Sequence, residues 1–113
     1  MKSFISFAII FCLLVSLTQG YIVSIINNKI DDIVTTVTAF KPVQEGIIRI
    51  IDKKSATSPK NYSLNITESI DSYLLEFEAG ALGGINIQGP ISNDKDECWE
   101  FYGTAYDWFV NEC

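Results

Sequence analysis

The chain has 113 residues, of which 48% are hydrophobic and 19% charged. This length allows one domain, and the hydrophobic content is too high for an intrinsically disordered chain. Fourteen acidic against eight basic residues give a net charge of −6, which argues against a nucleic-acid partner because phosphate binding needs a basic face.

The first twenty residues have the pattern of a secretory signal peptide. Lys2 is a short positive start, residues 4–17 are apolar apart from two serines, and Gly20 is a small residue at the expected cleavage position. The apolar run is shorter than the roughly 20 residues that a membrane-spanning helix needs, and no other segment reaches that length. We therefore predict cleavage before Tyr21, no membrane span, and a single small secreted domain at residues 21–113.

Removal of residues 1–20 changes the charge and the cysteine count. The remaining 93 residues lose Lys2, so their net charge is −7. They also lose Cys12, which leaves Cys98 and Cys113. Two cysteines in an oxidising compartment predict one disulfide, Cys98–Cys113.

Residues 21–40 have the apolar spacing of an amphipathic helix, with polar residues on the other half of the helical wheel. Isoleucine, valine and threonine are poor helix formers, however, and the part from Val34 onward also reads as a strand. We predict a helix from Ile22 to Thr36, which cannot continue through Pro42. The apolar stripe of residues 21–40 consists of Val23, Ile26, Ile30, Ile33, Val37 and Phe40.

Beyond Pro42 the apolar spacing becomes that of strands. Residues 47–51 are apolar on both faces, which is typical of a central strand. Residues 61–67, 72–78 and 85–91 alternate apolar and polar side chains and are separated by turn-forming segments. Together these elements predict an α+β fold: an N-terminal amphipathic helix packed on a small antiparallel β-meander of about four strands.

Two glycosylation sequons lie on one predicted strand. Asn61-Tyr62-Ser63 and Asn65-Ile66-Thr67 both match the Asn-X-Ser/Thr pattern. The alternation of residues 61–67 places both asparagines on the polar face, where a glycan would reach solvent. We predict glycans at Asn61 and Asn65.

The segment 98–113 is rich in aromatic residues and is closed by the predicted disulfide. A continuous helix would separate its two cysteines by about 22 Å, whereas bridged Cα atoms lie within about 7 Å. A hairpin turning at Gly103, with Trp99 facing Trp108, or a helix broken near Gly103 satisfies the bridge. The candidate binding surface is Trp99, Tyr102, Tyr106 and Trp108, because Tyr and Trp are favoured at binding hot spots, although aromatic side chains also build cores.

Nothing in the sequence indicates catalysis or a metal centre. The chain contains no histidine, which is the commonest general base and metal ligand. Asp94, Asp96 and Glu97 are closely spaced but lack the glycine and distal glutamate of a calcium loop. We predict no enzyme, no cofactor and no metal site.

Two functions are compatible with these features. The first is a secreted, non-enzymatic extracellular glycoprotein that acts as a monomer by binding a protein or carbohydrate partner. The second is a carrier of a small apolar ligand, a lipid, held between the helix and the sheet residues Tyr73, Leu75, Phe77, Ile85 and Ile87. A predicted loop with Lys53, Lys54 and Lys60 is either solvated or a contact for an acidic partner.

Overall fold

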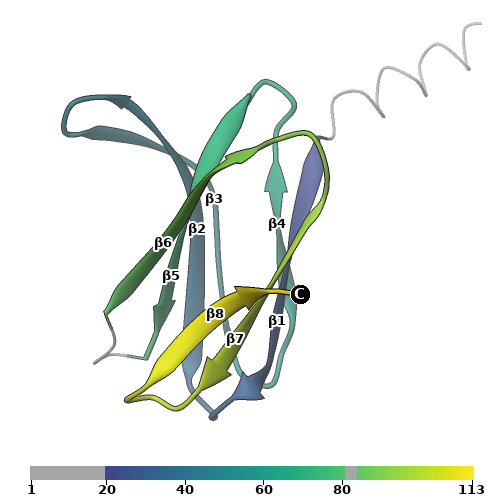
Figure 1. Ribbon diagram of the computed structural model, residues 1–113, viewed down its shortest axis with the longest axis vertical. Coiled ribbons are helices and arrows are strands. Elements are labelled where there is room, and N and C mark those ends of the chain that lie inside the picture. The colour runs from purple at the N-terminus through teal and green to yellow at the C-terminus, as the bar shows by residue number, and fades with distance from the viewer. Residues whose placement is uncertain (1–19, 81–83) are drawn as a thin grey trace, which may run out of the picture.

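The computed structural model describes residues 20–80 and 84–113, which form two four-stranded sheets packed face to face (Figure 1). The predicted signal peptide lies outside the described residues except for Gly20. The strands are β1 (Tyr21–Ile30), β2 (Val34–Gln44), β3 (Ile47–Thr57), β4 (Tyr62–Ile66), β5 (Ser72–Ala79), β6 (Ile85–Ser92), β7 (Glu97–Gly103) and β8 (Trp108–Glu112). The described residues contain no helix, so the α+β prediction is wrong and this part of the chain is all-β. Accordingly, none of these residues belongs to a helix able to cross a membrane.

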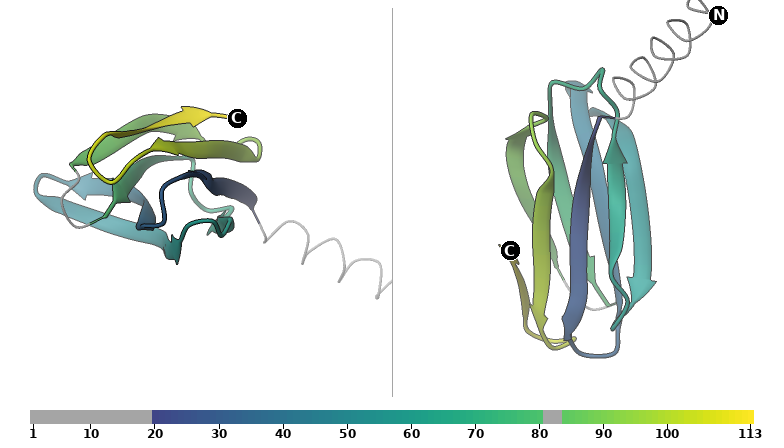
Figure 2. Two further views of the ribbon diagram at one scale, coloured as in Figure 1. Left: turned by 90° about the horizontal axis from the view of Figure 1, so that it is seen from below. Right: turned by 90° about the vertical axis from the view of Figure 1, so that its right-hand side faces the viewer.

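The strand order also differs from a meander. One sheet has the order β4-β1-β7-β8 and the other β3-β2-β5-β6, as the two views of Figure 2 show. The β1–β7 pair is parallel, and the other pairs are antiparallel. β1 and β2 follow one another in the chain but lie in opposite sheets, and the predicted strands β4 and β5 are likewise separated between the sheets.

The segment predicted as a helix forms β1 and the first half of β2. In β1, Val23 and Ile25 point into the core, and a register shift between Ile26 and Lys29 then changes the face so that Ile30 is buried as well. The bulge and the turn after Ile30 each shift the two-residue alternation of apolar side chains by one position. The resulting apolar spacing resembles that of a helix. The β-branched composition, which disfavoured a helix, is what decides the structure. The alternative strand from Val34 onward is confirmed.

The core lies between the two sheets and is centred on aromatic side chains. Phe77 of β5 is fully buried, and its ring centroid lies 5.5 Å from that of Trp99 and 5.6 Å from that of Phe101, both on β7. Phe101 is in turn 5.7 Å from Trp108 of β8. Aromatic pairs at these separations add to the stability gained by burial, so Phe77 joins one sheet to the other at the centre of the sandwich.

A second contact between the sheets is polar. The Thr35 hydroxyl donates to Asn27 Oδ1 at 2.9 Å and lies 2.8 Å from the Tyr62 hydroxyl, which joins β1, β2 and β4. Asn27 and Thr35 are fully buried, so these bonds satisfy polar groups that would otherwise be costly to bury. Burial raises the pKa of Tyr62 to about 12, and the hydrogen bond to Thr35 opposes that shift. Tyr62 therefore stays neutral at physiological pH.

Strand β6 presents the opposite face to the one predicted. Leu75 pairs with Gln88 and Tyr73 with Ile91, so the Gly89-Pro90 step places one extra residue in β6. Gly89 has a φ of +124°, and a Cβ on it would lie 3.0 Å from the Tyr73 carbonyl oxygen, so this bulge requires glycine.

The bulge in β6 decides which of its side chains reach solvent. Because the alternation changes face there, Ile85 and Ile87 are 60% and 54% exposed, although the sequence predicted them to point inward. Asn86 and Gln88 are half-buried instead, and the Gln88 side-chain amide donates to Asn86 Oδ1 at 2.7 Å. The edge of this sheet therefore presents two isoleucines to solvent.

Candidate binding surface

The four aromatic residues predicted as a binding surface do not form one surface. Trp99 is 7% exposed, and Trp108 packs against the core cluster. Tyr102 lies on the outer side of its sheet, where its ring stacks on Phe109 at 5.1 Å. Tyr106 is 85% exposed in the loop between β7 and β8. The structure thus uses the two tryptophans mainly in the core and leaves the two tyrosines outside it.

The C-terminal segment is a hairpin closed by the disulfide Cys98–Cys113, with a Cα–Cα distance of 5.3 Å. Its register differs from the one predicted, because Gly103 pairs with Trp108 and Trp99 with Glu112. The loop at residues 104–107 is held by the Thr104 hydroxyl, which accepts from the amides of Tyr106 and Asp107. The predicted facing of Trp99 and Trp108 was wrong because the turn is longer than a two-residue turn.

Both sequon asparagines are exposed on β4 or directly before it, while Leu64 and Ile66 are fully buried on the opposite face. Asn61 Oδ1 accepts from the backbone amide of Asn27 at 2.8 Å, and the Asn65 side chain lies on the outer face. A glycan is attached through the side-chain nitrogen, so the hydrogen bond to Asn61 Oδ1 does not use the atom that is modified.

We expect the protein secreted from a eukaryotic host to carry glycans at Asn61 and Asn65. Glycosidase treatment should raise its gel mobility in up to two steps, and Asn61→Gln or Asn65→Gln should each remove one step. The two sites are only four residues apart on one strand, so a glycan at one can hinder modification of the other. Unchanged mobility of the wild-type protein after treatment would contradict this prediction.

The predicted basic loop is a strand for most of its length. Lys53 and Lys54 belong to β3, and Lys54 Nζ lies 3.9 Å from Asp52 Oδ1. Asp52 Oδ2 also accepts from the backbone amide of Asn65, which holds β3 against β4. Among the described residues, no three or more His, Cys, Asp or Glu side chains converge in a way that could hold a metal ion.

Four exposed apolar side chains lie on the end of the β2–β3 hairpin, residues 41–50, which we call the arm. Pairing of β2 with β5 ends at Phe40 and Leu74, but pairing of β2 with β3 continues to Gln44 and Ile47. The arm therefore extends beyond β5 as a two-stranded ribbon, which projects at the upper left of Figure 1. Its exposed apolar side chains, between 47% and 56% accessible, are Val43, Ile47, Ile48 and Ile50.

The arm corrects the prediction of a central strand at residues 47–51. β3 lies at the edge of its sheet, and within that run only Ile51 packs against the core. The run is apolar on both faces because both faces of the ribbon are exposed, not because both are buried. The arm was the functional candidate that sequence reasoning missed, and its signal was this isoleucine run directly after the Glu45-Gly46 turn.

Comparisons with known proteins bear on the fold alone. No family model and no curated protein sequence matches the chain. Among solved structures, listeriolysin O aligns with a TM-score of 0.57 and 10% identity over 85% of this chain and 22% of its own. A crystal structure of wild-type pneumolysin aligns with a TM-score of 0.53 and 8% identity over 85% of this chain and 23% of its own. The chain thus spans about a quarter or less of these proteins and shares a two-sheet architecture with that part of them.

Proposed function

We propose that the protein is a secreted, non-enzymatic binding protein whose arm contacts an extracellular protein partner. The observation that carries this proposal is the exposure of four β-branched apolar side chains on one short projecting ribbon. Scattered exposed apolar residues are ordinary, but Ile48 and Ile50 lie together on one face of β3, and such a grouping is typical of an interaction site. Covering the group would remove apolar surface from water at a gain of about 25 cal/mol per Å² before the costs of association.

The chemistry of the arm favours a protein over a carbohydrate. Aliphatic side chains offer no hydrogen bonds, so a hydroxyl-rich sugar pressed against Ile48 and Ile50 would lose its bonds to water without replacement. A protein surface can instead supply apolar side chains of its own, as in the cores of protein–protein interfaces.

An extracellular location is supported by three features. The pattern of residues 1–20 is that of a signal peptide, the sequons at Asn61 and Asn65 are exposed, and the Cys98–Cys113 bridge is consistent with an oxidising compartment. The carrier hypothesis loses its site, because the described residues contain no helix to cover the sheet. Tyr73, Leu75 and Phe77 are instead buried between the two sheets.

Replacing Ile48 and Ile50 together by threonine should weaken partner binding about tenfold or more. Both residues lie on the same face of β3, and threonine keeps the β-branched shape while removing apolar contact area. Both are more than half exposed, so the stability of the domain should change little. The measurement is capture of the partner from the native extracellular fluid, followed by affinity determination with the purified partner.

The matched control is Ile85→Thr with Ile87→Thr, which changes two isoleucines of similar exposure on β6, a strand that does not belong to the arm. Binding should depend on the arm pair and not on the β6 pair. Equal loss in both variants, or loss in neither, would contradict the proposal. So would capture that disappears when glycans are stripped from the partner, or an arm variant that changes only the self-association measured by ultracentrifugation.

A further inference from the structure

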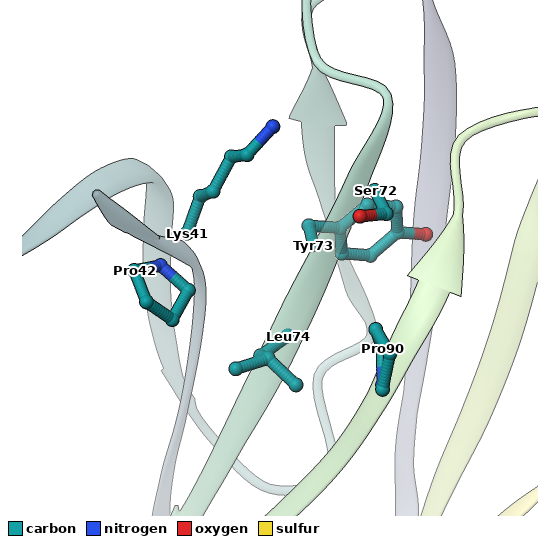
Figure 3. A pocket seen from close by; sticks show the side chains of 6 residues that line it. All are labelled: Lys41, Pro42, Ser72, Tyr73, Leu74 and Pro90. Carbon is teal, nitrogen blue, oxygen red and sulfur yellow. The ribbon is translucent and has the colours of Figure 1, made fainter. Parts of the chain in front are cut away.

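A pocket of about 330 Å³ lies at the base of the arm, where β2 separates from β5 (Figure 3). It begins just beyond the last residue pair of these strands, Phe40 and Leu74. Figure 3 shows Lys41 and Pro42 on the β2 side, Pro90 on the β6 side and Leu74 between them. The lining is completed by Ser72 and Tyr73 and is mainly apolar.

Lys41 is the one charged side chain among the residues that line this pocket. Burial, and then the nearby carboxylates of Glu97, Asp94 and Asp96, raise the pKa of Tyr73, so the acidic groups lie near Tyr73. The cross-strand partner of Lys41 is Arg49, so two cations stand opposite each other on the ribbon, an arrangement that costs stability. The ion pairs found among the described residues involve Lys29, Lys54 and Lys95, and neither Lys41 nor Arg49. The one carboxylate between residues 34 and 51 is Glu45, which lies in the turn at the far end of the arm.

We propose that this pocket binds a small amphipathic anion, namely a free carboxylate with a short hydrocarbon chain. The chain would pack on Pro42, Leu74 and Pro90, and the carboxylate would pair with the Lys41 ammonium and accept from the Ser72 hydroxyl. A pocket of this volume is at the lower end of the range for small-molecule sites, about 300–1,000 Å³, which suits a short chain. An anion there would also relieve the repulsion between Lys41 and Arg49.

The sign of the ligand charge is what the experiment must resolve. We would titrate the ¹⁵N-labelled secreted protein with octanoate, octylammonium and octanol, which share one hydrocarbon chain, and follow amide chemical shifts by NMR. Octanoate should give saturable shifts centred on the amides of Lys41, Ser72 and Leu74. Octanol should bind about tenfold or more weakly than octanoate, and octylammonium more weakly still.

Lys41→Met removes the charge and keeps the aliphatic stem, so it should weaken octanoate binding about tenfold or more and leave octanol binding unchanged. Lys53→Met, on an exposed part of β3 that does not line the pocket, is the control and should have no effect. Four results overturn the proposal: shifts that do not saturate, shifts centred on other residues, equal binding of octanoate and octylammonium, or octanoate binding unaffected by Lys41→Met. None of these results depends on the protein partner of the arm.

Discussion

Replacing Phe77 by alanine should lower the free energy of unfolding by about 3–5 kcal/mol. Phe77 is fully buried between the sheets, with 0% of its surface accessible to solvent. Its ring packs against Trp99 and Phe101. The truncation would leave a cavity where the Phe77 ring contacts two aromatic rings of β7. Since small domains are stable by only about 5–15 kcal/mol, this single change should consume much of the total.

Phe109→Ala is the matched control for the Phe77 variant. Phe109 is also aromatic but is 49% exposed and stacks on Tyr102 outside the core, so its loss should cost much less. Urea unfolding followed by tryptophan fluorescence measures both variants, because Trp99 and Trp108 belong to or adjoin the Phe77 cluster. A loss below about 1 kcal/mol for Phe77→Ala would show that the sheets are not joined through this ring.

The strands that were predictable from sequence are those whose alternation is uninterrupted. β4 and β5 bury every second residue, and the sequence placed Leu64, Ile66, Tyr73, Leu75 and Phe77 on the inner faces, where the structure has them. Neither strand itself carries the extra residue of a bulge, and the two-residue period is then sufficient. Leu74 is an apolar residue on the otherwise polar side of this alternation, and it is half-buried on the outer face and lines the pocket.

The errors arose where a bulge interrupts the alternation. One extra residue in β1 near Asn27 and Asn28 produced a helix-like period, and one at Gly89-Pro90 in β6 reversed the faces of Ile85 and Ile87. A bulge moves every later side chain to the other face, and its pairing partner lies far away in sequence. Local pattern alone therefore could not place these residues, although the β-branched composition of residues 21–40 opposed the helix from the beginning.

The candidate site was predictable in part. An apolar run on both faces has two physical explanations, burial on both sides or exposure on both sides, and residues 47–51 do not distinguish them without knowledge of the neighbouring strands. The structure shows that residues 47–50 are exposed on both sides, because β5 stops pairing with β2 at Phe40. The four predicted aromatic residues are divided for a related reason: a sandwich core must be filled, and Trp99 and Trp108 contribute to it.

Replacing Cys98 and Cys113 together by serine should lower the free energy of unfolding by about 3 kcal/mol, because the unfolded chain gains conformational entropy when the loop is opened. The bridge closes a separation of 15 residues around the β7–β8 hairpin. In a domain of this size such a loss corresponds to a fall in melting temperature of very roughly 12–24 °C. It would be the second large effect, comparable with the loss of the Phe77 ring.

The position of the bridge determines how the reduced protein should fail. β8 is a five-residue strand at the edge of its sheet, and it carries Trp108, which packs against the core. Without the disulfide, β8 is held by its pairing with β7 and by that contact, so we expect it to detach first and expose Trp108 to water. Detachment would appear as a red shift of the tryptophan fluorescence at temperatures below the main unfolding transition. The red shift should be absent when Trp108→Phe is added to the same double mutant. If thermal unfolding is unchanged, or if peptide mass spectrometry of the wild-type protein finds both thiols free, the bridge has no such role.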